Sequence, residues 1–257
     1  MNINGICVCV NYSDFLAYTL YLNVRHFSTF VVVTDTKDVE TKRICEMLNV
    51  TCVVTDVFYE GGARFRKGAG INVGLSILDN IVEFKAHGSG ALHSNAIEYA
   101  QEERSDDWYV HLDSDIILPP DFKGIVAEAS LQPDYLYGCD RWMLNSFEEA
   151  QPTLSALLEG TALPEHSFER GRRVEPPHVG YTPIGFLQLW NPFMSGIHRY
   201  PEKKGDASSD DVHFAYNWVR EKRHRIEGLG VYHLDSVTST MGVNWQGRTT
   251  KRFTWED

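Results

Sequence analysis

The 257-residue sequence has few cysteines, a shortage of basic residues and no long apolar run. Nothing in it approaches the ~18 consecutive apolar residues of a membrane-spanning helix, so we expect no transmembrane segment. The five cysteines include no CxxC pair and no paired metal-ligand spacing, which predicts reduced thiols in the core. With 24 basic against 35 acidic residues the formal charge is −11, and such a surface repels phosphate backbones. We therefore expect no nucleic-acid partner.

The opening residues, MNINGICVCVNYSD, lack the basic n-region and small-residue cleavage site of a secretory signal. This predicts a cytoplasmic protein. The length is ample for a large core, and the chain shows no repeat, low-complexity tract or linker. We therefore expect a single domain over residues 1–257.

Two common phosphate-binding motifs are also missing from the sequence. It has no GxxxxGK[ST], and no GxGxxG follows the first predicted strand, where Asn11, Tyr12, Ser13 and Asp14 stand instead. A P-loop and a dinucleotide-binding fingerprint are therefore excluded.

Apolar, β-branched runs alternate with helical spacing in the first part of the chain. The runs that predict strands are 5–10, 30–34, 51–55 and 108–112. Segments 14–27 and 38–48, between the first three runs, repeat apolar residues at helical spacing. This order predicts an α/β fold with a mostly parallel sheet flanked by helices, whose ligands bind at the carboxyl ends of the strands.

The rhythm changes after the fourth predicted strand. Further strands are predicted at 135–139 and 186–190, and a long stretch rich in Pro, Gly and Arg, 159–183, separates them. A stretch of this length is typical of a lid, a binding segment or a small helical insert. We expect this second part to complete the ligand site.

The fourth predicted strand ends in Asp113-Ser114-Asp115. Alternate side chains of an extended chain point the same way, so Asp113 and Asp115 can converge on one cation. Carboxylate oxygens favour Mg²⁺ or Mn²⁺. A solvated turn is the alternative, because this segment precedes Pro119-Pro120 and has good loop chemistry. Its place after a buried strand favours the cation site.

A basic pair, Arg66-Lys67, precedes small residues and a predicted helix start at 67–74. The N–H groups and dipole of such a helix end favour phosphate. A solvated lysine beside glycines that merely turn the chain is the alternative. A second small-residue helix start leaves the register of this segment open between 64–74 and 85–96.

Two acids, Asp210 and Asp211, open another predicted helix. Helix capping explains one of them, and Asp210 is the better candidate for it. The other is free to accept a proton as a general base. Downstream, His233 ends a strand-like run; it is either structural or completes a mixed O,O,N cation site with the acids of 113–115.

Together these segments resemble the GT-A fold nucleotide-sugar glycosyltransferases, in the expected order over most of the chain. The resemblance implies a Rossmann-like nucleotide-sugar-binding half over about 1–118 and an acceptor-binding half over about 119–257. Asp113-Ser114-Asp115 matches the family's DxD motif, so Mn²⁺ or Mg²⁺ is expected on the donor diphosphate, with Asp113, Asp115 and His233 as ligands.

The resemblance also implies roles for the other candidate residues. Donor-binding residues would be Asn11, Tyr12, Asp14, Asp35, Arg64, Lys67, Asn72, Asp113 and Ser114, and acceptor-binding residues would be Gly185 and Phe186. Apart from the resemblance, Arg248 is a further cationic contact for the phosphates. Trp190 is a candidate for stacking on an acceptor sugar, with packing in the core as the alternative. Asp210-Asp211 resembles the family's Glu-Asp pair, which makes Asp211 the base if the enzyme inverts; a retaining enzyme needs no such base. The first acid departs from the family pattern, and no Gln-x-x-Arg-Trp signature follows, so we do not expect polymerisation.

The predicted function is metal-dependent transfer of a sugar from a nucleotide sugar, with UDP as the default nucleotide, to a hydroxyl of a glycan or similar acceptor. Two alternatives stay open. One is a metal-dependent nucleotidyl or phosphoryl transferase or hydrolase, which also uses paired aspartates at a strand end. The other is a non-catalytic nucleotide-sugar-binding module. The donor sugar, the acceptor, the stereochemistry and the oligomeric state stay undetermined.

Overall fold

The computed structural model describes residues 1–87, 106–163, 180–202, 206–235, 244, 246–248 and 252–253. Its sheet has the strand order β3-β2-β1-β4-β7-β6-β8-β5. In chain order the strands are β1 (Asn2–Val8), β2 (Thr29–Thr34), β3 (Thr51–Val54), β4 (Asp107–Leu112), β5 (Ile116–Ile117), β6 (Leu136–Leu144), β7 (Leu187–Trp190) and β8 (Arg223–Leu234).

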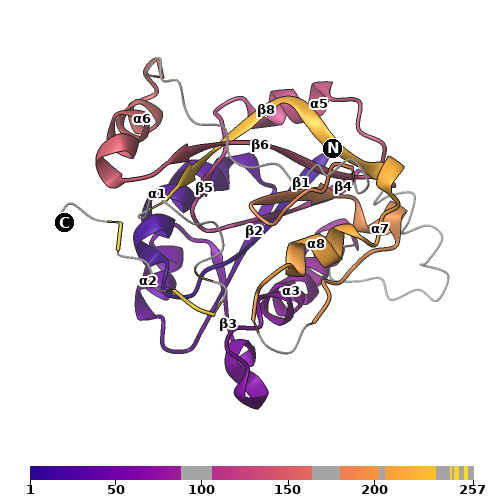
Figure 1. The fold of residues 1–257 in the computed structure, drawn as a ribbon, viewed down its shortest axis with the longest axis horizontal. Coiled ribbons are helices and arrows are strands. Elements are labelled where there is room, and N and C mark those ends of the chain that lie inside the picture. The colour runs from indigo at the N-terminus through magenta and orange to yellow at the C-terminus, as the bar shows by residue number, and fades with distance from the viewer. Residues whose placement is uncertain are drawn as a thin grey trace.

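Helices connect and flank these strands (Figure 1). The α-helices are α1 (Ser13–Asn23), α2 (Val39–Met47), α3 (Lys67–His87), α5 (Phe122–Glu128), α6 (Phe147–Glu159), α7 (Pro192–Ser195) and α8 (Asp210–Ala215). Short 3₁₀ turns are η1 (Val24–His26), η2 (Val57–Gly62) and η4 (Arg220–Lys222). None of the described helices is both long enough and apolar enough to cross a bilayer.

The first half of the sheet is parallel, because β1 pairs with β2 and β4 and β2 pairs with β3. Helices α1 and α2 cover one face of these strands and α3 covers the other (Figure 1). Strands buried on both faces have near-continuous apolar sequences, which is why β1, β2 and β4 were recognisable as strands. The edge strand β3 is partly exposed, and its β-branched residues made it recognisable. The predicted fold class, α/β with a Rossmann-like first half, is confirmed.

Alternate residues of β1 serve the two faces of the sheet. Ile6 packs with Leu75 of α3, and Cys7 packs with Leu16 of α1. Gly74 lets α3 approach the sheet, because a Cβ there would lie 2.4 Å from an Ile6 methyl group. Close contact with a strand is therefore built into this helix.

The predicted apolar stripe of segment 38–48 is partly wrong. Ile44 and Cys45 of α2 are buried, whereas Val39 and Met47 are 63% and 70% exposed. Helix α2 is only nine residues long, so its inward face has room for few side chains. The cysteine prediction is correct: all five are free, and four of them are buried.

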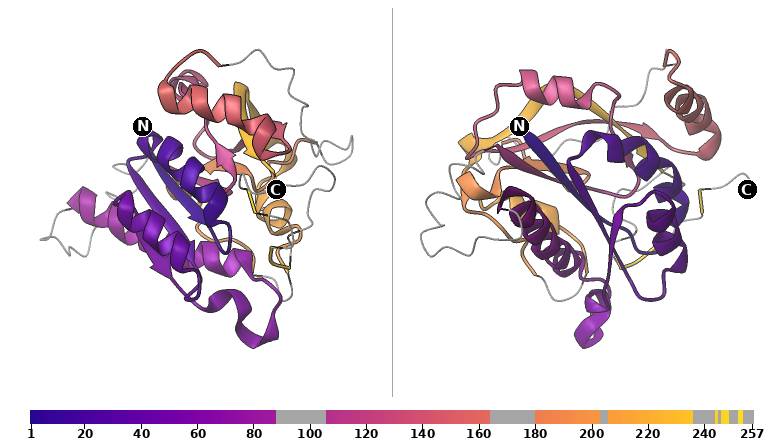
Figure 2. Two further views of the ribbon diagram at one scale, coloured as in Figure 1. Left: turned by 90° about the vertical axis from the view of Figure 1, so that its left-hand side faces the viewer. Right: turned by 180° about the vertical axis from the view of Figure 1, so that it is seen from behind.

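The second half of the sheet mixes strand directions. β7 is antiparallel to β4 and β6, β6 is parallel to β8, and the short β5 pairs antiparallel with β8. In both views of Figure 2, α6 lies away from α3. Its apolar side chains pack with residues of α1, β5 and β8. The β5–β8 pairing sets Ile116 opposite His233, and it thereby brings the end of β8 beside the acids that follow β4. The interior of stretch 159–183 lies outside the described residues.

A buried histidine makes stability depend on pH. His26 is 3% exposed, its ring packs edge-on against Phe122, and its Nε2 has no hydrogen-bond partner among the described residues. Burial, reinforced by the nearby Arg25 and Lys123, lowers the pKa of His26 to about 4. Below the ordinary histidine pKa of about 6.5, His26 therefore takes up a proton in the unfolded chain but not in the folded protein.

We expect the free energy of unfolding to fall by up to about 3 kcal/mol between pH 6.5 and pH 4 because of His26. His26→Phe should flatten this part of the profile, since it keeps a ring and removes the titrating group. Urea unfolding at a series of pH values measures the effect. An unchanged slope in His26→Phe would assign the acid sensitivity to other groups.

Candidate functional site

A cleft of about 590 Å³ opens at the carboxyl ends of β1 and β4 and is lined on its other side by the start of α8 and the end of β8. Eleven of the predicted site residues line it: Tyr12, Lys67, Asp113, Ser114, Asp115, Gly185, Phe186, Asp210, Asp211, His233 and Arg248. The topology thus brings together four motifs that are far apart in the sequence.

Asp113 is held at the cleft by contacts on two sides. Its backbone N–H donates to the carbonyl of Phe186 at 3.3 Å, and its Oδ1 forms an ion pair with Nζ of Lys67, the first residue of α3. The buried His111 lies 3.8 Å from the same oxygen, and burial lowers its pKa far below the usual range, so the imidazole is neutral. Burial raises the pKa of Asp113 despite the opposing effect of Lys67. Lys67 is therefore the positive partner of this acid.

Asp115 has one satisfied and one unsatisfied carboxylate oxygen. Oδ2 lies 3.3 Å from Nε2 of His233. Burial acts to raise the pKa of Asp115, but His233 and Lys67 together outweigh it, and the pKa is lowered. Oδ1 is buried with no hydrogen-bond partner in the described part of the chain. A buried carboxylate oxygen without a partner is costly, and a bound cation would satisfy it.

His233 contacts a second residue, Arg141 of β6, which the sequence analysis missed. The Nη1 of Arg141 lies 2.9 Å from Nδ1 of His233. Arg141 is buried, and its guanidinium stacks 4.9 Å from the centre of the Phe186 ring. The charged pair Asp140-Arg141 within the largely apolar β6 was the available signal, because an arginine is seldom buried without a partner.

The two acids that open α8 have separate environments. Asp210 is 3% exposed, and its Oδ2 accepts the backbone N–H of Gly68 at 3.1 Å, so it caps the start of α3. A carboxylate therefore already binds the start of α3, the helix end that we predicted to favour phosphate. Asp211 lines the cleft, and its oxygens accept the N–H groups of Gly185 at 2.7 Å and Val212 at 2.8 Å. Of the two acids, Asp211 is the less buried.

Six predicted residues are not among the lining residues of the cleft: Asn11, Asp14, Asp35, Arg64, Asn72 and Trp190. Asn72 exchanges hydrogen bonds with the backbone of Tyr200, which fixes the chain after α7 to α3. Trp190 is fully buried in the core, so its ring offers no face to a sugar. Asp35 accepts the N–H of Lys37 at 2.7 Å in the turn after β2.

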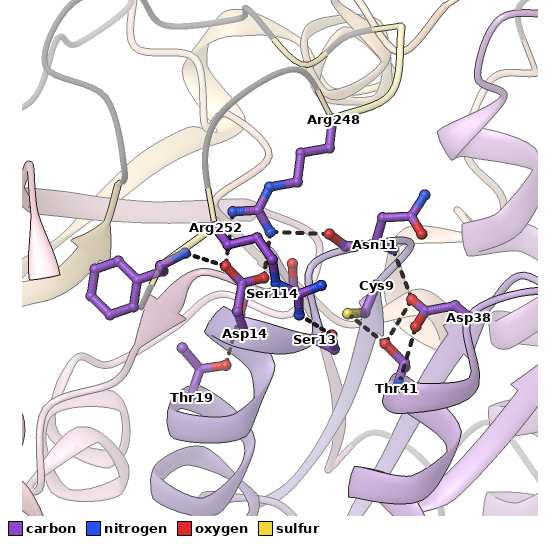
Figure 3. Close-up of polar contacts among 11 residues, drawn as sticks. Cys9, Asn11, Ser13, Asp14, Thr19, Asp38, Thr41, Ser114, Arg248 and Arg252 are labelled. Carbon is purple, nitrogen blue, oxygen red and sulfur yellow. Dashed lines mark hydrogen bonds and ion pairs between the residues drawn. The ribbon is translucent and has the colours of Figure 1, made fainter. Parts of the chain in front are cut away.

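Asp14 and Arg248 bind each other (Figure 3). Nη2 of Arg248 lies 2.8 Å from Oδ2 of Asp14, and Nη1 contacts Oδ1 and donates to the carbonyl of Asn11 at 3.0 Å. The guanidinium also stacks on the Tyr12 ring at 4.7 Å, and the Phe253 N–H donates to Asp14. This two-point ion pair joins Arg248 to the start of α1, and Arg248 still lines the cleft.

Removing one member of this ion pair should destabilise the protein strongly. Arg248→Met leaves the Asp14 carboxylate buried without its bidentate partner, and we expect the free energy of unfolding to fall by about 3 kcal/mol or more. Chemical denaturation measures it. Arg43→Met, which breaks an exposed pair on α2, is the matched control and should change stability by less than about 1 kcal/mol. Equal effects of the two substitutions would contradict a structural role for Arg248.

The helix predicted after the basic pair begins at Lys67 and runs as α3 to His87, and Lys67 of register 64–74 lines the cleft. Residues 88–96 of the alternative register lie outside the described residues. Arg64 is exposed. Lys67 is thus the one predicted residue of this segment that reaches the acids.

The charge of the cleft bears on its ligands. Five aspartates and three basic side chains line it, a formal charge of −2 with the histidines neutral. Within the described ranges, no three His, Cys, Asp or Glu residues are clustered as a ready-made metal site. Asp113 and Asp115 nevertheless fit a hard divalent cation, because both offer carboxylate oxygen and Oδ1 of Asp115 has no other partner among those residues.

Comparisons with known proteins give structural likenesses at low identity. No protein-family model and no curated protein matches the sequence. Glucosyl-3-phosphoglycerate synthase from Mycobacterium tuberculosis, solved with Mn²⁺ and UDP-glucose, is 10% identical, with a TM-score of 0.47, over 94% of this chain and 72% of that one. A 4-diphosphocytidyl-2C-methyl-D-erythritol synthase is 13% identical, with a TM-score of 0.45, over 89% of both chains.

Proposed function

We propose that this protein is a GT-A-type glycosyltransferase that transfers a sugar from a nucleotide sugar, with UDP as the nucleotide, to a hydroxyl acceptor. The observation that carries the proposal is the convergence of three aspartates in one cleft. Asp113 and Asp115 come from the end of β4, and Asp211 comes from the start of α8. A leaving-group site and a proton acceptor are the two parts that an inverting sugar transfer needs.

The charge of the cleft supports a divalent cation in this reaction. A diphosphate entering a cleft of formal charge −2 is repelled, and two charges at close range in a partly buried site interact by several kcal/mol. Asp113 and Asp115 would hold Mn²⁺ or Mg²⁺ through carboxylate oxygens. When bound, the cation stabilises negative charge that develops on the departing diphosphate.

The remaining residues of the cleft have roles that follow from their contacts. Lys67, already paired with Asp113, supplies a second positive charge on the diphosphate side. Asp211 takes the proton of the attacking hydroxyl, because its carboxylate faces the cleft. The N–H groups of Gly185 and Val212 fix the orientation of that carboxylate. The protein thus separates stabilisation of the leaving group from activation of the nucleophile.

Product analysis tests this proposal. Nucleotide sugars incubated with the protein, Mn²⁺ and a panel of hydroxyl acceptors should release nucleoside diphosphate together with a glycosylated product. Release of pyrophosphate from a nucleoside triphosphate and a sugar phosphate would instead identify a nucleotidyltransferase. Saturable binding of nucleotide sugar with no product from any acceptor or from water would identify a binding module.

A further inference from the structure

We propose that His233 is not a ligand of the cation but the hydrogen-bond donor that orients Asp115, and that Arg141 is the positioning residue that fixes this role. The inference deepens the proposed function, because it concerns the cation site assigned there. It departs from the expectation that His233 is the third ligand.

The proton positions follow from the contacts of the imidazole. Arginine has only donors, so the contact of 2.9 Å between Arg141 Nη1 and His233 Nδ1 requires a lone pair on Nδ1. In the neutral ring the proton then lies on Nε2. Nε2 faces Oδ2 of Asp115 at 3.3 Å, where a carboxylate accepts that proton in a hydrogen bond. Both contacts specify the same tautomer.

A nitrogen that carries a proton has no lone pair for a metal ion. Histidines that bind metals usually donate their other ring N–H to a carboxylate or a carbonyl, which leaves the ligating nitrogen free. In His233 the other ring nitrogen, Nδ1, contacts the donor Arg141 instead of an acceptor, so the proton stays on Nε2 and that nitrogen is not free to bind a metal. Arg141 is itself immobilised by burial and by stacking on Phe186.

This tautomer determines which carboxylate oxygen of Asp115 is available to a cation. With Oδ2 fixed by His233, Oδ1 is the oxygen without a partner among the described residues, and it is left for the cation. The site then offers carboxylate oxygens alone, a chemistry that suits Mg²⁺ and Mn²⁺ and gives no special advantage to ions that prefer nitrogen. Arg141 thereby determines which cations the cleft prefers.

The direct test is the tautomer itself. Long-range proton–nitrogen NMR spectra of the full chain, labelled with ¹⁵N in its histidine rings, report which ring nitrogen carries the proton. His233→Gln assigns the signal by its loss. We expect the Nε2–H form without metal and the same form when Mg²⁺ and UDP are added. An Nδ1–H form, or loss of the Nε2 proton on adding Mg²⁺, would overturn the inference.

Calorimetric titrations with Mg²⁺ and Co²⁺ supply an independent measurement. His233→Gln keeps an N–H for Asp115 and should leave the ratio of the two affinities unchanged. Arg141→Met frees Nδ1 to take the proton, exposes a lone pair on Nε2, and should raise the preference for Co²⁺ by about tenfold or more. The double variant should lose that gain. A Co²⁺ preference in the wild type that His233→Gln abolishes would show that His233 is a ligand.

Two residues of β8 provide matched controls. Arg225→Met and His224→Gln make the same chemical changes outside the cleft, and neither should alter the affinity ratio. The two proposals also fail separately. If the protein transfers no sugar, the spectrum of the metal-free chain still decides the tautomer; if His233 proves to be a ligand, glycosyl transfer stands.

Discussion

Asp211→Asn should lower the turnover number of sugar transfer by about a hundredfold to ten-thousandfold, the range expected for loss of a general base. The amide cannot accept the proton of the attacking hydroxyl. Donor binding should stay within about threefold of wild type, because the proposed mechanism has Asp211 act on the acceptor hydroxyl and not on the diphosphate. Single-turnover kinetics with a saturating donor separates the two effects.

Asp134→Asn is the matched control for Asp211→Asn, since Asp134 is paired with Lys222 and is not among the residues that line the cleft. It should keep full activity. Wild-type turnover in Asp211→Asn would end its role as a base and favour a retaining reaction. In that case Asp211 would only position the acceptor, and the N–H groups of Gly185 and Val212 would hold its carboxylate as they do here.

The second large effect concerns cation-dependent binding. Asp115→Asn should weaken binding of UDP in the presence of Mn²⁺ by about tenfold to a hundredfold, down to the affinity measured in EDTA. The reason is the oxygen Oδ1, which is buried without a hydrogen-bond partner among the described residues and is the acceptor best placed for a cation. The amide is neutral and a poorer ligand, although it can still accept the bond from His233.

Calorimetry with Mn²⁺ and with EDTA measures the effect of Asp115→Asn. A thermal-unfolding scan of the same variant checks the fold, since a misfolded protein would also lose affinity. If the variant keeps the same difference between Mn²⁺ and EDTA as wild type, Asp115 does not hold the cation.

Most of the parallel half of the fold could be predicted because β1, β2 and β4 are almost wholly buried and largely apolar, and helical spacing separates the first two. The edge strand β3 is partly exposed, and its β-branched residues made it recognisable. β8 is different: its burial alternates irregularly over twelve residues, and only its last residues were recognisable as a strand. Strand pairing across β6, β7 and β8 joins residues up to 90 positions apart, such as Leu144 and Leu234, which no local pattern encodes.

For the site, too, local patterns could be predicted and long-range contacts could not. Asp113, Asp115 and Asp211 could be proposed because the sequence around them indicates a strand end or a helix start. The ion pair between Asp14 and Arg248 could not be predicted, since the two residues are 234 positions apart and no local pattern joins them. Arg141 escaped notice for the same reason: its partner His233 is 92 positions away.

The most direct test of the central claim is the linkage between cation and nucleotide. UDP titrated into the wild-type protein should bind about tenfold to a hundredfold more tightly with saturating Mn²⁺ than in EDTA, and Mn²⁺ should bind more tightly with UDP by the same factor. Such reciprocity requires the cation and the diphosphate to meet in one site. Equal affinity for UDP in Mn²⁺ and in EDTA would contradict a cation held by Asp113 and Asp115 against the leaving group.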